Sequence, residues 1–307
     1  MIGRARDTSR TIHVTLDPSE SCARRHPELM FTKVIAGWDG TPESEAAAAW
    51  AARHCQDGPL TLVDALGGKP TGSEYLRATG ERSAERTRLL DAAERLRASH
   101  PGLRVETETV HGSAIDALAE RLASDTLVVV GGPDHRRTTR WTIGSRLAGR
   151  HDGGPVAVIP EAPATERRVA VVAGVDGSQA SLAAVEVAAA EADRLGAPLE
   201  IVHAWQVPAQ WDTGSSGYGS DVDTLEEIHR DLLDEAVEYA RELGAKPTGR
   251  LETGPAAEVL RKIGRSSRML VVASHGAGAF TRFFLGSVSH DLLAEPPAPV
   301  LIIAPQG

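Results

Sequence analysis

The residues with the clearest chemical potential form a junction near the carboxyl end of the chain. The apolar run Met269–Val272 predicts a buried strand, and the stretch that begins at Gly286 has the apolar spacing of a helix. Because the first N–H groups of a helix have no partner within it, a helix that starts behind small residues can bind an anion. The turn from Ala273 to Gly276 is mostly small, and Ser287 and Ser289 add hydroxyl donors, so the pattern predicts a phosphate-binding site.

The same pattern occurs once earlier in the chain. The apolar run Leu127–Val130 is followed by Gly131, and Gly144-Ser145 begins the corresponding helix. Either copy alone could be an ordinary strand–loop–helix junction of a parallel sheet. His275 could likewise be a phosphate donor or an exposed loop side chain. The repetition is the observation that favours a ligand site over the ordinary junction.

The elements that must position these junctions alternate between strands and helices. In the first half of the chain we predict strands over Lys33–Gly37, Leu60–Ala65, Leu103–Val110, Leu127–Val130 and Val156–Ile159, with a helix between successive strands. This alternation is typical of an open parallel sheet with helices on both faces. The second half repeats the order, since Asp176-Gly177-Ser178 matches Asp39-Gly40-Thr41 and Gly286-Ser287 matches the earlier Gly-Ser pair.

Both junctions resemble the universal stress protein family, whose nucleotide-binding members carry the motif G-x-x-G-x9-G-[ST] after the fourth strand. The late copy departs from it with Ala273 at the first Gly, and the early copy departs with Asp134 at the second Gly. The resemblance implies two tandem, doubly wound, Rossmann-like domains over residues 31–161 and 167–305, each an open parallel five-stranded sheet with strand order 3-2-1-4-5. Residues 1–30 do not fit the repeat, and we expect them to form a disordered N-terminal extension.

The resemblance also implies a site for ATP or another adenine nucleotide, with Mg²⁺, at the switch in strand order. In the second half it places the adenosine near Gly174, Val175, Asp176 and Ala204, and the phosphates on Gly276, Gly286, Ser287 and Val288. The first-half counterparts are Gly37, Trp38, Asp39 and Ala65, then Gly131, Gly144, Ser145 and Arg146. The two aspartates could instead only cap their helices. We expect the second half to bind more tightly, because Asp134 puts a carboxylate beside the first phosphate site.

Composition limits the classes of function. The 307 residues carry a formal net charge of −9, which argues against nonspecific binding of nucleic acid, and no apolar run approaches the ~18 residues of a membrane helix. The two cysteines, Cys22 and Cys55, lack metal or disulfide spacing, which favours a cytoplasmic protein. The sequence contains no Walker A motif, no G-x-G-x-x-G after a strand and no G-x-S-x-G elbow, so we expect no enzyme.

Two functions from different classes remain open. The first is an ATP-binding stress or regulatory protein whose nucleotide occupancy changes a surface that a protein partner reads. The alternative is a nucleotide-free interaction module in which the altered glycines mark decayed sites, and a slow ATPase is a weaker third.

In either case the fifth strands, Val156–Ile159 and Val300–Ile303, are apolar edges without protecting charges. We predict that they pair antiparallel within one chain, which leaves other faces for a homodimer.

Overall fold

The computed structural model describes residues 31–55, 58–67, 75–133, 142–150, 154–161, 169–207, 219–275 and 285–304. The N-terminal extension, Asp134 and Gly276 lie outside these ranges, as does most of the connection between the halves. The predicted boundaries of the two domains stay predictions. We call the part up to residue 161 the first half and the part from residue 169 the second half.

The elements follow the predicted alternation in both halves. The first half runs through β1 (Lys33–Gly37), α1 (Pro42–His54), β2 (Leu60–Leu66), α2 (Tyr75–Ser99), β3 (Val105–His111), α3 (Ala114–Ala119), β4 (Thr126–Gly131), α4 (Ile143–Ala148) and β5 (Val156–Ile159). The second half runs through β6 (Val171–Val175), α5 (Gln179–Leu195), β7 (Leu199–Trp205), α6 (Gly219–Glu242), β8 (Pro247–Thr253), α7 (Ala256–Gly264), β9 (Met269–Ala273), α8 (Ser287–Ala294) and β10 (Val300–Ile303).

One helix is shorter than the sequence predicts. The sequence that follows Gly112-Ser113 predicts a helix through Leu122, but α3 ends at Ala119. The N–H groups of Arg121 and Leu122 bond to carbonyls three residues earlier, at 3.1 and 3.2 Å, instead of four. The last turn is therefore tightened toward 3₁₀ geometry, a common way for a helix to end.

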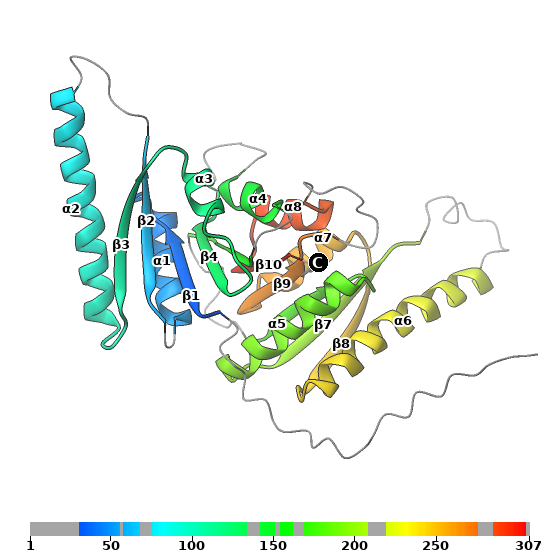
Figure 1. Ribbon diagram of the computed structural model, residues 1–307. Helices are drawn as coiled ribbons and strands as arrows, with labels where there is room; N and C mark the ends of the chain where they lie inside the picture. Colours follow the sequence, from blue (N-terminus) through cyan, green and yellow to red (C-terminus); the bar gives the residue numbers. More distant parts are fainter. Residues whose placement is uncertain are drawn as a thin grey trace, which may run out of the picture.

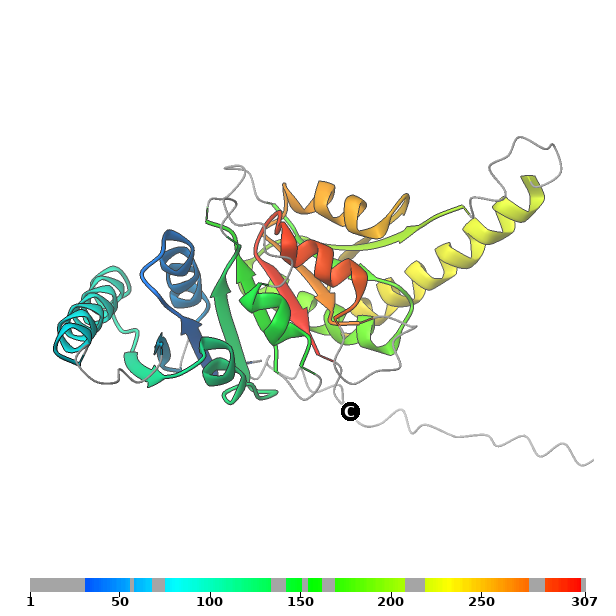
Figure 2. The same cartoon turned by 90° about the horizontal axis from the view of Figure 1, so that it is seen from above.

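The strands form one sheet in the order β3-β2-β1-β4-β5-β10-β9-β6-β7-β8. Each half has the expected order 3-2-1-4-5 with parallel neighbours, and the two halves meet where β5 pairs antiparallel with β10. The predicted pairing of the fifth strands is thus confirmed. Figure 1 and Figure 2 show the result as an elongated molecule in which α2 and α6 lie at opposite ends.

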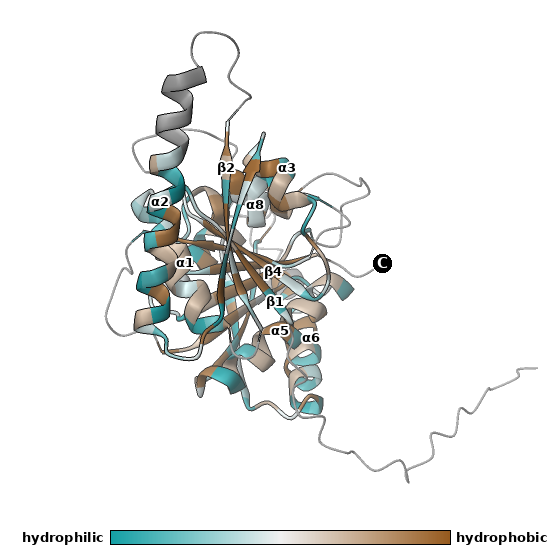
Figure 3. Ribbon diagram, turned by 60° about the vertical axis from the view of Figure 1, so that its left-hand side comes forward, coloured by the Kyte–Doolittle hydropathy of each residue, from teal (hydrophilic) through white to brown (hydrophobic). Residues whose placement is uncertain are grey.

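Helices cover both faces of this sheet because its strands are apolar on both faces. One hydrophobic cluster lies under α1, α2, α5 and α6, and a second lies under α3, α4, α7 and α8. Alternate residues of β1 enter different clusters, since Val34 and Ala36 belong to the first and Ile35 to the second. Figure 3 shows the hydrophobic strands between helices whose outer sides are more hydrophilic.

The seam between the halves carries a buried polar contact as well as the strand pair. His54, at the end of α1, has its Nε2 atom 3.6 Å from Oε2 of Glu191 on α5, and both side chains are 7% exposed. Arg194 donates two hydrogen bonds to the same carboxylate, so the charge of Glu191 is already compensated. Burial, assisted by the positive charge of Arg194, therefore dominates and lowers the pKa of His54 to about 3.

This histidine should give the fold a measurable acid sensitivity. Because the pKa of His54 is lower in the folded protein than in the unfolded one, the unfolded state binds more protons from about pH 6.5 down to about pH 3. Stability is then lost as the pH falls through that range, by about 2 kcal/mol between pH 7 and pH 5. In urea unfolding, His54→Gln should lose correspondingly less stability over this interval than the parent.

The exposed His111 supplies the matched control. His111→Gln should keep the pH dependence of the parent, because its side chain is exposed at the end of β3. If His54→Gln and His111→Gln show the same change in unfolding free energy between pH 7 and pH 5, the buried neutral state of His54 is refuted.

Candidate functional site

The turn after the first strand is built in the same way in both halves. Oδ1 of Asp39 accepts from the N–H and the hydroxyl of Thr41, at 3.0 and 2.6 Å, and Asp176 does the same with Ser178, at 3.0 and 2.5 Å. The glycine between has φ of 77° in one half and 79° in the other, a conformation that favours glycine. Thr41 and Ser178 then cap α1 and α5. The aspartates therefore orient the capping residue and are not the caps themselves.

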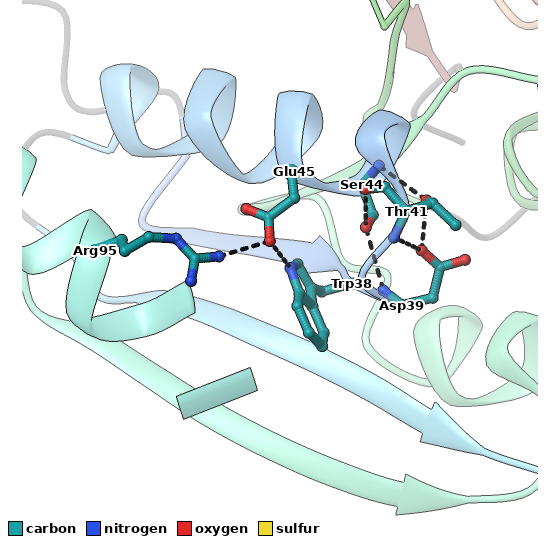
Figure 4. A network of polar contacts seen from close by, with 6 residues as sticks. All are labelled: Trp38, Asp39, Thr41, Ser44, Glu45 and Arg95. Carbon is teal, nitrogen blue, oxygen red and sulfur yellow. Dashed lines mark hydrogen bonds and ion pairs between the residues drawn. The ribbon is translucent and has the colours of Figure 1, made fainter. Parts of the chain in front are cut away.

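In the first half a network of polar contacts adjoins this turn (Figure 4). Trp38 is 5% exposed, and its Nε1 donates to Oε1 of Glu45 at 3.3 Å. Arg95 of α2 donates to the same oxygen at 2.8 Å. The Trp38 side chain belongs to the core cluster under α1 and α2. The N–H of this predicted site residue is engaged as well, since it donates to the carbonyl of Val63 at 2.9 Å.

In the second half a cavity of about 560 Å³ opens at the carboxyl ends of β6, β7 and β9. It lies between these strand ends and the N-terminal ends of α7 and α8. Ten predicted residues line it, namely Gly174, Val175, Asp176, Ala204, Ala273, His275, Gly286, Ser287, Val288 and Ser289. The remaining second-half candidate, Gly276, is outside the described residues. The structure thus brings the adenosine and phosphate candidates of this half to one cavity.

Five further residues line the cavity that sequence reasoning did not single out. They are Ser181, Val202, Ala256, Leu260 and Val272. Leu260 of α7 explains one predicted glycine, because a Cβ at Gly174 would lie 2.8 Å from its Cδ1 atom. The glycine therefore lets α7 approach the end of β6. The sequence gives only a weak signal that α7 forms a cavity wall, because that role depends on how α7 packs on the sheet.

The N-terminus of α8 faces the cavity, and no side chain in the described part of the chain caps it. Gly286 occupies the N-cap position, and its N–H donates to the carbonyl of Ser274 at 2.7 Å, which ties the helix to the end of β9. Ser287 is exposed at the first helical position. Ser289 is buried instead, and its hydroxyl donates to the carbonyl of Ala273 at 2.6 Å. Of the two predicted hydroxyl donors, Ser287 is the accessible one.

The corresponding helix of the first half starts differently. α4 has six residues and is capped by Thr142, whose Oγ1 accepts from the N–H of Ser145 at 3.1 Å. The Ser145 hydroxyl donates to the carbonyl of Thr142 at 3.0 Å, so both donors of this predicted phosphate residue are engaged. Gly144 is buried within the helix, and a Cβ there would lie 2.4 Å from Cγ2 of Val158. This glycine serves the packing of α4 on β5.

The other first-half candidates lie at the ends of adjacent strands, apart from Arg146. A Cβ at Gly131 would lie 2.7 Å from the backbone of Glu43, which explains the glycine by the close approach of α1. A Cβ at Gly37 would lie 3.0 Å from Cδ1 of Leu118. Ala65 is half-buried near the end of β2, and Arg146 is exposed on α4. Thus several residues that match the family motif have a packing role here.

A pair of histidines supports the cavity wall from the α6 side. Because a carbonyl oxygen can only accept, His203 donates through Nδ1 to the carbonyl of Val175, at 2.8 Å. Its Nε2 then accepts from Nδ1 of His229, also at 2.8 Å, and Trp205 stacks on the His229 ring. Burial, and next the neighbouring His203, lowers the pKa of His229. An ionisable residue in the middle of the apolar run of β7 was the sequence signal for this pair.

The first half has a carboxyl group at the position equivalent to His203. Asp64 follows Val63 in β2 as His203 follows Val202 in β7, and it is buried. Burial raises the pKa of Asp64, and the negative charges of Glu85 and Asp39 raise it further. The two halves therefore have different charge and hydrogen-bonding character behind the same strand end.

Comparisons with known proteins are consistent with the repeat. The sequence pattern described as "Universal stress protein family" matches residues 30–148 and 169–304. A universal stress protein of Mycolicibacterium smegmatis is 31% identical over 292 residues, which span 89% of this chain and 97% of that protein. A universal stress protein of Mycobacterium tuberculosis is 28% identical over 306 residues, with 88% and 94% covered.

Solved structures share the fold. A universal stress protein from Archaeoglobus fulgidus has a TM-score of 0.62 at 15% identity, covering 89% of this chain and 98% of its own. A putative universal stress protein from Pseudomonas aeruginosa has a TM-score of 0.60 at 16% identity, covering 90% and 94%. In the described part of this chain, no helix is long and apolar enough to cross a membrane. The described residues also contain no group of three or more metal-ligating side chains.

The two serines of α8 lie in different environments, so removing their hydroxyl groups should lower the free energy of unfolding by different amounts. Ser289→Ala leaves the buried carbonyl of Ala273 without the hydroxyl donor and should lower the free energy of unfolding by about 1 kcal/mol. Ser287→Ala removes an exposed hydroxyl and should change it by less than about 0.5 kcal/mol. Urea denaturation of both variants measures the difference, and equal losses would contradict this assignment.

Proposed function

The chain belongs to the universal stress protein family, and on that premise we propose that it is an ATP-binding regulatory protein of a stress response. The observation that carries the proposal is the second-half cavity, which is lined both by Asp176 and by the N-terminus of α8, where no described side chain caps the helix. Free N–H groups at a helix N-terminus and the helix dipole both favour a bound phosphate. Nucleotide occupancy would then alter the surface that a protein partner reads.

The dimensions and chemistry of the cavity support a nucleotide. Its volume of about 560 Å³ is within the ~300–1,000 Å³ typical of small-molecule sites. The walls offer apolar side chains, among them Leu260 and Val272, for a flat base. The exposed Ser287 hydroxyl adds a donor beside the α8 N-terminus. The two titratable side chains of the cavity wall already have hydrogen-bond partners, Asp176 in the turn to Ser178 and His275 at Ser274, so we propose binding without hydrolysis.

Magnesium is part of the proposal as a companion of the phosphates. In nucleotide sites Mg²⁺ is usually held by phosphate oxygens and only one or two carboxylates. Asp176 is the carboxylate that lines this cavity. The bound ion would supply positive charge against the phosphate groups, while the chain supplies the α8 N–H groups and the Ser287 hydroxyl.

We propose that the second half is the tighter of the two sites. In the first half Thr142 already occupies the N-terminus of α4, and both donors of Ser145 are engaged. Asp134 adds a sequence argument, since two like charges ~4 Å apart cost about 1 kcal/mol in water and ~4 kcal/mol at an effective dielectric of 20. The cap of α4 by Thr142 favours the alternative function, a nucleotide-free interaction module, but only for the first half.

The paired aspartates allow a matched test in the intact chain. Asp176→Ala and Asp39→Ala remove the same two turn hydrogen bonds in different halves, so their structural cost is comparable. In calorimetric titration with ATP and Mg²⁺, Asp176→Ala should weaken binding at least about fivefold, which corresponds to about 1 kcal/mol. Asp39→Ala should leave that binding event nearly unchanged. Gly286→Asp should also weaken it, because it adds a carboxylate at the N-cap of α8.

Each outcome of this titration has a distinct meaning. If Asp176→Ala and Gly286→Asp both bind ATP like the parent, the site assignment is wrong. If Asp39→Ala loses as much affinity as Asp176→Ala, the ranking of the halves is wrong. Chromatography of the nucleotide released from heat-denatured, freshly purified protein identifies the ligand independently, and a protein that neither carries nor binds an adenine nucleotide is the interaction module.

A further inference from the structure

The seam between the halves has a local twofold pseudo-axis. Ala157 and Leu301 are the second residues of β5 and β10, so they hold equivalent positions, and they face each other in the strand pair. The residue that precedes Ala157 faces the residue that follows Leu301, and the residue that follows Ala157 faces the one that precedes Leu301. Such a register is symmetric about the central pair. A residue on the axis therefore faces its own counterpart from the other half.

The helices above the seam repeat this relation. His54 lies thirteen positions after Thr41, the N-cap of α1, and Glu191 lies thirteen positions after Ser178, the N-cap of α5. They are again equivalent positions, and their side chains are in contact, at 3.6 Å. Ala157 and Leu301 lie in the core cluster on the side of the sheet that α1 and α5 cover. Two separate contacts thus place counterparts against each other on one face.

Both contacts join unlike residues. A neutral imidazole meets a carboxylate in one, and a small side chain meets a large one in the other. Two second halves paired in this register would put Glu191 against a second glutamate and Leu301 against a second leucine. Although Arg194 pairs with each Glu191, two carboxylates in contact still repel where burial lowers the dielectric, and extra side-chain volume forces strain. Two first halves would leave a cavity between alanines and bring two buried imidazoles together.

We propose that this seam selects its partner, so that a first half pairs with a second half in preference to another copy of itself. The His54–Glu191 and Ala157–Leu301 contacts are the selective elements. The surface formed by β5 and α1 accordingly fits the β10 and α5 surface of a second half, and it fits poorly to another β5 and α1. This selectivity is independent of whether either half binds a nucleotide.

Double-mutant cycles in the intact chain measure this preference directly. His54→Glu creates the contact of two second halves, and Glu191→His creates the contact of two first halves. Ala157→Leu and Leu301→Ala do the same in the strand pair. Each single variant should unfold at lower urea concentration, whereas the reversed doubles H54E/E191H and A157L/L301A restore unlike partners. The unfolding constant of each double should be at least about fivefold lower than the product of its single effects implies.

A cycle at equivalent positions away from the axis supplies the control. Leu62 of β2 and Ile201 of β7 are equivalent, fully buried, and separated by six strands in the sheet order. The effects of Leu62→Ile and Ile201→Leu should multiply to within about twofold. Multiplicative effects in both seam cycles would overturn the proposal. Coupling in one seam cycle assigns the selectivity to that contact, and the strand cycle decides alone if His54→Glu fails to fold.

Discussion

The hydrogen-bonding need of two apolar edge strands is the constraint on which this structure depends. β5 and β10 are buried along their whole length, yet each would end its own five-stranded sheet with a row of unpaired N–H and C=O groups. Pairing them satisfies both rows at once and makes a continuous sheet. The edges that remain, β3 and β8, include exposed charged residues such as Glu106 and Arg250, which oppose further strand addition.

The two halves differ where the fold would permit them to be the same. Both keep the Asp-Gly turn after the first strand, because that turn starts α1 and α5. They diverge at the helix after the fourth strand, where α4 is capped by Thr142 and α8 begins at Gly286 with no cap from a described side chain. A helix start can satisfy its own N–H groups or present them to a ligand, but one group does not do both. The asymmetry of the proposed sites follows from this local difference.

Much of the fold was predictable because its signals are local. The apolar runs, the repeated turn at Asp39 and Asp176, and the bare edges of β5 and β10 led to the strand order and to the pairing of the halves. The cap of α4 by Thr142 was not predicted. The hydroxyl of Thr142 and the flexibility of Gly144 both suit the start of a helix, and only the path of the backbone determines which of the two residues holds that position. Leu260 was missed as a cavity wall because its place depends on how α7 packs on the sheet.

The unlike residues on the pseudo-axis have a consequence for how such a gene can change. In a symmetric dimer every substitution on the axis appears twice and must tolerate a copy of itself, so Glu191 would have had to face glutamate. Covalent joining of two copies removes that requirement and lets each side of the axis diverge alone. Once a carboxylate occupies one side and an imidazole the other, losing either half of the gene would leave the remaining half facing itself across an ill-matched seam. The duplication thus becomes hard to reverse.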